Sequence, residues 1–331
     1  MLIKQFPEDF IVEEVPIVFS GSGNYAIYKF TKRNYTTESA VAVVCKRFNI
    51  RRKDVKYAGN KDKHAVTTQY ISIFNYHKDL KLDTPDLKLE FVSYHLEPLS
   101  LGSLLGNKFI ITVRDISDDN RINVLEFLPN YYDEQRFSKN NFEIGLALLK
   151  KDYKKAVELN DDEDVKKYIS KYHTDYVGAL RKIPIKVLSI YIHSVQSFIF
   201  NEALYNITKD EQDKVKDKRY YNGFEVDYSL GKFFFTKYYD DSKLPLVGFD
   251  TVSEGKVGVI MDRLEIKPKD FIIRAIPELS VEQSFRDCFM KISNFSYKWK
   301  EEDCVLEFFL PKGSYATIVL KAFFPQTTQQ E

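Results

Sequence analysis

The chain has 331 residues, of which 44% are apolar and 29% charged, and its formal net charge is +1. A chain of this length can bury two sizeable cores, so we expect two domains. No apolar run approaches the roughly 20 residues of a membrane-spanning helix, so we expect no membrane segment. The near-zero net charge argues against binding to nucleic acid by bulk electrostatics alone.

The N-terminal segment and the cysteines indicate the compartment. A lysine at position 4 and acidic residues from position 8 fit neither a secretory signal nor a transit peptide. Cys45, Cys288 and Cys304 match no pairing or metal-ligand pattern, which suits a reducing environment. We therefore expect a cytoplasmic protein without a disulfide.

Segments of the N-terminal third carry clear secondary-structure patterns. Residues 24–30, NYAIYKF, are rich in β-forming residues and follow a Gly-Ser-Gly turn, so they predict a strand. Residues 36–50 predict a helix, because Thr36 or Thr37 can cap it and apolar residues recur at helical spacing. Strands are predicted again at residues 67–74 and 107–116.

The middle of the chain is helical in pattern, and the end returns to strands. Residues 142–173 and 193–208 have apolar residues at helical spacing, and the charge run 209–223 is typical of a solvated surface. Residues 304–324 predict two strands that flank a Pro-Lys-Gly turn. We infer one mixed domain that is interrupted by a largely helical insertion.

Positive charge is concentrated between Lys29 and Lys63. This stretch has eleven Lys or Arg residues and three acidic residues, so its local charge is 11 − 3 = +8. Aromatic residues are interleaved with these charges or lie just before them: Tyr25, Tyr28, Phe30, Tyr35 and Tyr57. The pattern is typical of a surface that neutralises phosphates and stacks on bases, and a solvated helix face is the alternative.

Several kinds of chemistry are not indicated. The five histidines are isolated from one another and from the cysteines, so we expect no metal site. The Gly-Ser-Gly turn lacks the rest of a dinucleotide fingerprint, and there is no phosphate-binding Gly-Lys-Ser/Thr, so we expect no cofactor. What remains is a carboxylate, Asp62, inside the basic segment AGNKDKHAVTTQ between a predicted helix and a predicted strand.

A single carboxylate can serve as a nucleophile or as a general base. Hydrolysis of a glycosidic bond usually takes two carboxylates. One suffices when the departing group is reattached to the same sugar, as in the isomerisation of uridine to pseudouridine. Whether such a carboxylate attacks the ribose carbon or removes a proton to give a glycal is left open by the sequence.

Ordered motifs along the chain resemble those of the TruD family, the pseudouridine synthases that modify uridine 13 of tRNA. They are KQFPEDFIVEE, GSGNYAIYKFTKRNYTT, DVKYAGNKDKHAVTTQYISI, LPNYYDEQRFS, SVQSFIFNEAL, LPLVGFDT and FLPKGSYATIVLK. The resemblance implies an α+β fold: a catalytic domain with a mixed, mainly antiparallel sheet at residues 1–155 and 281–331, interrupted by an α-rich insertion domain at 156–280. It also implies an enzyme that acts on uridine 13 in the D arm of tRNA with no cofactor and no metal. We expect a monomer, although the sequence leaves the oligomeric state open.

The same resemblance assigns site residues. Asp62 would be the catalytic carboxylate, and Lys4 the basic partner that keeps it ionised. The uridine pocket would be lined by Phe10, Asn130, Tyr132, which stacks on the base, and Tyr315, which closes the pocket. Independently of the resemblance, the basic stretch predicts RNA contacts for Arg51, Arg52, Lys63 and His64, and His64 is alternatively a loop residue without such a contact. Gln69 and Thr67 are expected to brace the Asp62 loop. Arg136 either binds phosphate or makes a structural ion pair, and the structural role is favoured.

The chain departs from the family pattern at four places. Ser138 stands where Gly is common, Tyr132 where Phe is common, and Lys321 where Arg is usual, and the segment 95–107 has no Lys or Arg. These differences affect the expected docking of tRNA rather than the chemistry. A non-catalytic RNA-binding or chaperone protein on the same scaffold is the alternative function, and a nucleoside hydrolase is a more distant one.

Overall fold

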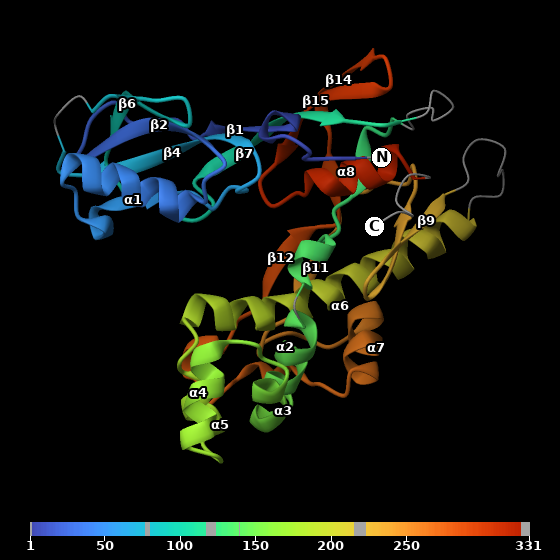
Figure 1. Cartoon of the computed structure of the whole chain (residues 1–331). Helices are drawn as coiled ribbons and strands as arrows, with labels where there is room; N and C mark the ends of the chain where they lie inside the picture. Colours follow the sequence, from blue (N-terminus) through green and yellow to red (C-terminus); the bar gives the residue numbers. More distant parts are fainter. Residues whose placement is uncertain (1, 77–79, 117–123, 139, 215–222, 326–331) are drawn as a thin grey trace. The chain divides into compact units, whose positions relative to one another are not determined.

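The computed structural model describes residues 2–76, 80–116, 124–138, 140–214 and 223–325 (Figure 1). They form two compact units. Unit 1 is built from Met1–Glu126 and Lys291–Ala316, and unit 2 from Phe127–Met290 and Thr317–Pro325. The domain boundaries at 155/156 and 280/281 were predicted from the family resemblance, and they stay a prediction.

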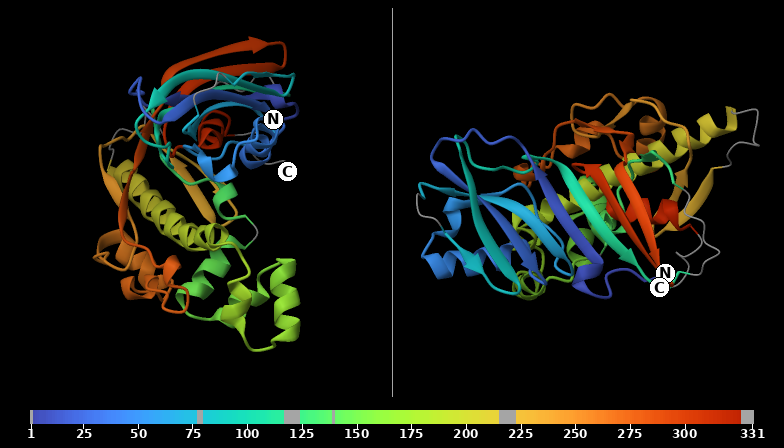
Figure 2. Two further views of the ribbon diagram at one scale, coloured as in Figure 1. Left: turned by 90° about the vertical axis from the view of Figure 1, so that its left-hand side faces the viewer. Right: turned by 90° about the horizontal axis from the view of Figure 1, so that it is seen from above.

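Unit 1 is built on a sheet that has nine strands within the described residues. Figure 2 shows it as a broad layer of blue, cyan and red strands. The strand order is β14-β15-β7-β1-β4-β2-β6-β5, with β3 beside β4. The strands are β1 (Phe10–Pro16), β2 (Tyr25–Arg33), β3 (Val55–Tyr57), β4 (Val66–Phe74), β5 (Leu82–Asp83), β6 (Leu87–His95), β7 (Leu104–Val113), β14 (Ser293–Lys300) and β15 (Asp303–Pro311). Neighbours in the sheet run antiparallel except β1 and β4, which are parallel.

Helix α1 (Thr37–Phe48) packs on this sheet and helps to fill its core. Thr36 caps the helix by accepting a backbone hydrogen bond in the first turn. Ala40, Val41 and Val44 lie on one face of the helix and are fully buried in a cluster with residues of the sheet. The amphipathic pattern therefore fixes how α1 covers the sheet. Two short 3-10 turns, η1 (Pro7–Asp9) and η2 (Arg52–Asp54), complete the unit.

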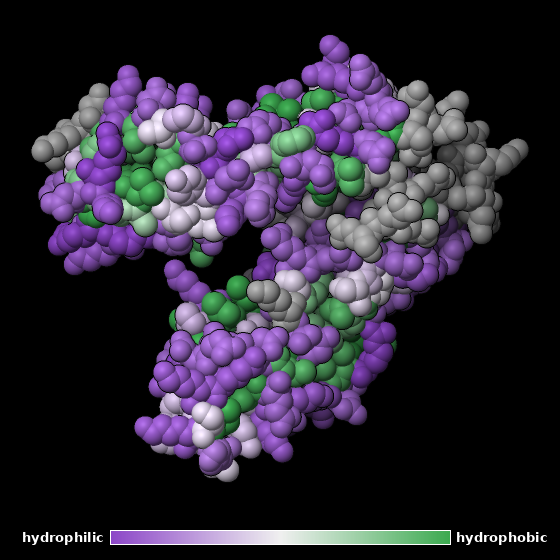
Figure 3. All heavy atoms as spheres, in the orientation of Figure 1, coloured by the Kyte–Doolittle hydropathy of each residue, from purple (hydrophilic) through white to green (hydrophobic). Residues whose placement is uncertain are grey.

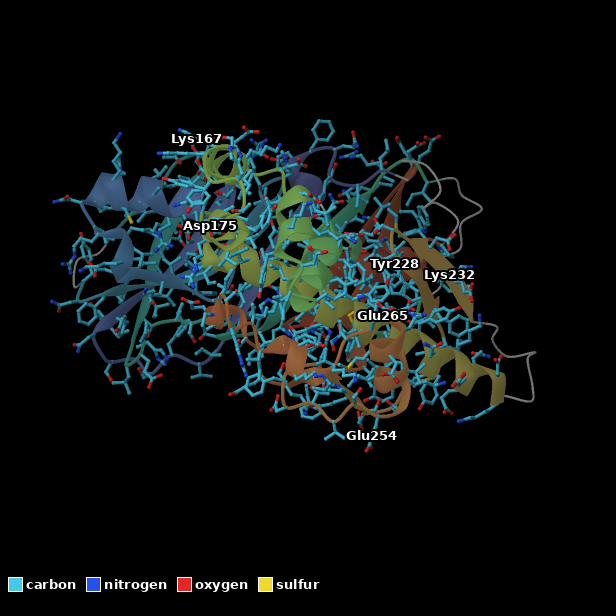
Figure 4. The ribbon with its side chains drawn as sticks, turned by 90° about the horizontal axis from the view of Figure 1, so that it is seen from below. Lys167, Asp175, Tyr228, Lys232, Glu254 and Glu265 are labelled. Carbon is cyan, nitrogen blue, oxygen red and sulfur yellow. The ribbon has the colours of Figure 1, made fainter. Side chains whose placement is uncertain are left out.

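Unit 2 is organised around α6 (Ile185–Lys214), a helix of 30 residues (Figure 1). Its central stretch is buried on most sides, with polar residues such as Gln196 and Asn201 among the buried ones, and α2, α7, β10 and β11 contact it. The other elements are β8 (Phe127–Pro129), η3 (Glu134–Arg136), α2 (Asn141–Leu149), α3 (Tyr153–Glu158), α4 (Glu163–Lys171), α5 (Tyr176–Leu180), β9 (Phe224–Tyr228), β10 (Gly231–Phe235), β11 (Lys243–Leu246), α7 (Gly255–Arg263), η4 (Pro268–Phe271), η5 (Pro277–Leu279), β12 (Ser284–Asp287), β13 (Phe289–Lys291) and α8 (Ala316–Phe323). Tyr228 and Lys232, labelled in Figure 4, mark the β9–β10 hairpin.

Most of the predicted elements are present. The strands predicted at 24–30, 67–74 and 107–116 are β2, β4 and β7, and the predicted helices at 36–50 and 193–208 are α1 and part of α6. The segment 142–173 is divided into α2, α3 and α4, because Asp152 and Asp162 cap new helices inside it. The charge run 209–223 begins in α6, and its residues 215–222 lie outside the described residues.

One predicted strand is wrong. The second half of 304–324 is helix α8, not a strand. Most residues of α8 are buried, and its β-branched residues Thr317, Ile318 and Val319 suggested a strand that does not form. The predicted α+β class with a mainly antiparallel sheet is confirmed. Across the described ranges, no helix is long and apolar enough to cross a membrane, and the face drawn in Figure 3 is mostly hydrophilic.

Candidate active site

Asp62 lies in the loop that joins β3 to β4 in unit 1. Its Oδ2 atom is 3.3 Å from Nζ of Lys4, and the two groups form an ion pair. The Asp62 side chain is 34% exposed and that of Lys4 is 27% exposed. The carboxylate is thus held next to an opposite charge while a substrate can still reach it. The catalytic roles of the two residues stay predictions.

The chain at Lys4 is fixed by contacts on both sides. Leu2 forms a β-bridge with Arg114, which ties the N-terminal segment to the end of β7. Lys4 has a φ of 57°, in the left-handed region that non-glycine residues seldom adopt. Its Nζ atom lies 4.1 Å from the ring centroid of Phe10, close enough for a cation–π interaction. Phe10 itself is buried, and its ring meets Phe109 edge-on.

A second lysine, Lys32 on β2, holds the Asp62 loop from inside. It is 0% exposed, and its Nζ donates hydrogen bonds of 2.6 Å to the carbonyl oxygens of Tyr35 and Asp62. A third, longer bond of 3.4 Å reaches the carbonyl oxygen of Lys61. Burial lowers the pKa of Lys32 to about 8, although the Asp62 carboxylate opposes this shift. The ammonium group therefore fixes the backbone of Asp62 and adds positive charge nearby.

Side chains of other elements brace the same loop. Gln69, buried on β4, donates from Nε2 to the carbonyl oxygen of Gly59 at 3.1 Å and accepts from Thr37 at 3.0 Å, which confirms its predicted bracing role. Thr37 Oγ1 also accepts from the backbone N–H of Lys61. The Lys61 ammonium pairs with buried Glu14 at 2.8 Å. This contact network holds the backbone before Asp62 in one conformation.

The predicted contribution of Thr67 is not found. Its Oγ1 is buried and has no hydrogen-bond partner within the described part of the chain. The residue belongs to β4 and lies opposite Lys32 in the sheet. Its location is therefore as expected, but its hydroxyl does not brace the loop.

The four predicted RNA-contact residues fall into two groups. Arg51 pairs with Asp54 at 2.7 Å, and Arg52 pairs with Glu38 at 2.7 Å, so acidic neighbours already neutralise both guanidinium groups. Lys63 is exposed beside Asp62, and its ammonium has no ion pair with any described residue. His64 is likewise exposed. Lys63 and His64 are therefore the more available of the four for an anionic ligand.

The other predicted pocket residues are distributed over both units. Tyr315 is half-buried in unit 1, between β15 and α8. Asn130 and Tyr132 belong to unit 2, where Oδ1 and the backbone oxygen of Asn130 accept hydrogen bonds from Arg286. The Arg286 guanidinium carbon lies 4.0 Å from the ring centroid of Tyr132, which is 7% exposed. Asn201 fixes the Tyr132 backbone through two hydrogen bonds.

Sequence reasoning missed Lys32 and Arg286. A signal for Lys32 was present: it follows Tyr28 and Phe30 at two-residue spacing, which places all three on the same face of β2. A lysine on a buried strand face must find hydrogen-bond partners, and here these are the carbonyls of the Asp62 loop. Arg286 gave no comparable signal, because its partner Asn130 is distant in sequence.

Possible metal ligands are not clustered in the part of the chain that the structure describes. Within residues 2–76, 80–116, 124–138, 140–214 and 223–325, no group of three or more His, Cys, Asp or Glu residues is placed to hold a metal ion. The three cysteines are free thiols, and Cys288 and Cys304 are buried. The contact that the Asp62 carboxylate makes is instead with a cation, Lys4.

Comparisons with known proteins agree on one family. The family model described as tRNA pseudouridine synthase D (TruD) matches residues 1–162 and 238–323. A "Probable tRNA pseudouridine synthase D" of Nanoarchaeum equitans is 29% identical to this chain over 98% of each chain. A "Probable tRNA pseudouridine synthase D 1" of Methanococcus maripaludis is 30% identical over 98% of this chain and 99% of that protein.

A solved structure from Methanosarcina mazei is also named as a tRNA pseudouridine synthase D (TruD). Its sequence is 23% identical to this chain, and its fold matches with a TM-score of 0.67 over 98% of this chain and 93% of that chain. At this identity the likeness concerns the fold. The family model and the relatives confirm the predicted recognition and the predicted enzyme class: the chain belongs to the tRNA pseudouridine synthase D (TruD) family.

Proposed function

We propose that the chain isomerises uridine to pseudouridine in tRNA, at uridine 13 of the D arm, with Asp62 as the catalytic carboxylate. The observation that supports this proposal best is the ion pair between Asp62 and Lys4 on a braced loop, with the carboxylate partly exposed. An ionised carboxylate next to a cation would be ready to act on an electrophilic sugar carbon or on a sugar proton. Members of its family carry the name of this activity.

The reaction conserves atoms, so it needs no second substrate. The bond between N1 of uracil and C1′ of ribose breaks, the uracil turns in the site, and its C5 bonds to C1′. C5 then loses its proton and N1 gains one. Asp62 would assist either by adding to C1′ or by removing a proton from C2′, and its carboxylate is regenerated in both routes.

Further residues are proposed to hold the RNA. Phe10, Asn130, Tyr132 and Tyr315 would contact the target nucleotide. Since base–aromatic stacking contributes about 1–3 kcal/mol per base, aromatic contacts of this kind could retain a detached uracil. Arg51, Arg52, Lys63 and His64 would contact the RNA backbone. The catalytic domain would comprise residues 1–155 and 281–331, and the insertion domain residues 156–280. A tRNA-modifying enzyme of this kind would act in the cytoplasm.

The proposal is tested by mapping pseudouridine. A tRNA transcript is incubated with the purified protein, treated with carbodiimide and analysed by primer extension. We expect one new stop that reports position 13, and no stop in a transcript that has cytidine there. Tight binding of the transcript without any new stop would favour the alternative, a non-catalytic RNA-binding protein on the same scaffold.

Replacement of Lys4 tests the ion pair. Lys4→Met keeps the length of the side chain but removes the charge 3.3 Å from Asp62. We expect the single-turnover rate to fall by about tenfold to a hundredfold, the scale of one close interaction between charges. Lys88→Met, which removes an exposed lysine of the same unit, is the control and should keep the rate. A normal rate in Lys4→Met would mean that the ion pair is not used in the reaction.

Salt dependence tests the RNA contacts. Affinity for tRNA should fall with ionic strength, and Lys63→Gln should reduce the slope of log affinity against log salt by about 0.7–0.9. Arg51→Gln should reduce it less, because Asp54 already neutralises Arg51. The slopes are measured by filter binding at several salt concentrations. A larger change in Arg51→Gln than in Lys63→Gln would contradict this assignment.

A further inference from the structure

A pocket of about 180 Å³ lies within unit 2, beside Tyr132. Its wall is formed by Arg136 of η3, three residues of α6, Leu246 of β11 and Ser284 of β12. The α6 residues are His193, Gln196 and Ser197. Figure 1 shows β11 and β12 beside α6, and β11 contacts that helix. The volume is sufficient for a phosphate group together with part of a sugar.

The charge of Arg136 in this pocket is not neutralised by protein. Its guanidinium makes no hydrogen bond or ion pair with any residue that the structure describes, and its Nε atom is buried without a partner. The acidic neighbours, Asp133 and Glu134, both lie near Lys321 instead, at 2.8 and 3.8 Å. The structural ion pair that the sequence predicted for Arg136 is therefore made by Lys321. A guanidinium with a buried, unpaired N–H is costly unless a ligand supplies an acceptor.

The remaining wall of the pocket suits an anion. None of the residues that line the pocket is acidic, and Ser197 and Ser284 provide hydroxyl groups. His193 is exposed, and its pKa is lowered by desolvation of the ring and by the positive charge of Arg136. The ring of Tyr132 provides an aromatic surface, and the guanidinium carbon of Arg136 lies 5.1 Å from its centroid.

We propose that this pocket binds a phosphate group of the RNA substrate, with Arg136 as its principal ligand. A guanidinium presents parallel N–H donors that match the oxygens of a phosphate. The neighbouring Tyr132 is proposed to contact the target nucleotide, so base contact and phosphate contact would come from one pocket. The assignment of this phosphate to RNA rests on the proposed function, in which tRNA is the substrate.

Binding measurements test the site without turnover. Calorimetric titration of the full chain with inorganic phosphate should show binding to the wild type, and Arg136→Gln should abolish it. The same variant should bind tRNA about tenfold to a hundredfold more weakly, because a charge-assisted bond is lost, with a salt slope smaller by about 0.7–0.9. Arg136→Lys should keep part of the affinity. Arg274→Gln, which removes an exposed arginine of the same unit, is the matched control and should bind phosphate normally.

The outcomes separate this proposal from the proposed function. No phosphate binding by the wild type overturns the site, whatever the variants do. Phosphate binding that requires Arg136, combined with unchanged tRNA affinity in Arg136→Gln, overturns the assignment to RNA and indicates a free anion as the ligand. If the expected binding results hold but no pseudouridine is formed, the proposed function fails and the RNA phosphate site stands. Thermal unfolding of each variant verifies that it is folded.

Discussion

Asp62→Asn should reduce pseudouridine formation to background while tRNA remains bound. The amide is nearly the same size as the carboxylate, so the loop held by Lys32, Gln69 and Thr37 should keep its conformation. An amide cannot serve as nucleophile or base. The loss concerns an interaction needed only on the way to the transition state, so it should appear in the rate and not in the affinity.

The measurement is the single-turnover rate with enzyme in excess, together with the dissociation constant of the complex. We expect a fall in rate of at least about 10⁴-fold, as when a nucleophile or base is removed. Binding should be equal or tighter, because a negative charge next to RNA is gone. Asp86→Asn removes an exposed carboxylate of the same unit and is the control, with a normal rate expected. Substantial turnover by Asp62→Asn would show that another group is the catalyst.

The sequence predicted the elements whose patterns are local. Helix α1 has a capping residue, Thr36, and one apolar face, so its start and its packing follow from a single stretch of chain. Strand β2 is recognisable from its β-forming residues. Helix α8 was predicted wrongly because Thr317, Ile318 and Val319 are β-branched and favour a strand locally, whereas tertiary packing decides the conformation of this largely buried segment. Such packing is a property that a local pattern does not contain.

The site divides in the same way. Asp62 and Lys4 were identified from motifs, and they are 58 residues apart in the chain yet in contact. Lys32, which holds the Asp62 loop, was not identified. Its hydrogen bonds go to backbone carbonyl groups, and because every residue has such a group, the sequence does not mark the partners. A structural ion pair was favoured over phosphate binding for Arg136, but the nearby Asp133 pairs with Lys321 of α8 instead. Competition between distant residues for one partner cannot be read from a linear pattern.

Lys32→Met should lower the single-turnover rate by about a hundredfold and change tRNA affinity much less. Met has a similar length but no donor, so the carbonyl oxygens of Tyr35 and Asp62 lose their bonds of 2.6 Å. The Asp62 backbone is then free to shift, and a displacement of about 1 Å in a reacting group can cost a factor of about 100. Lys29→Met, which removes an exposed lysine on the same strand, is the control. Equal rates in both variants would contradict a positioning role for Lys32.

The pH dependence separates this role from a general effect on folding. Burial lowers the pKa of Lys32 to about 8, so the wild-type rate should fall as pH rises through that value and the ammonium is lost, whereas the low rate of Lys32→Met should lack this step. The effect on stability has the opposite sign. Between pH 8 and the ordinary lysine value of 10.5, the unfolded chain binds the proton and the folded chain does not, so this group increases the free energy of unfolding as pH rises. Single-turnover rates and free energies of unfolding by denaturant are measured for both proteins from pH 7 to 9.5. As pH rises, the wild-type rate should fall. The free energy of unfolding of the wild type minus that of Lys32→Met should increase. A decline in activity that is equally steep in Lys32→Met would assign it to another group.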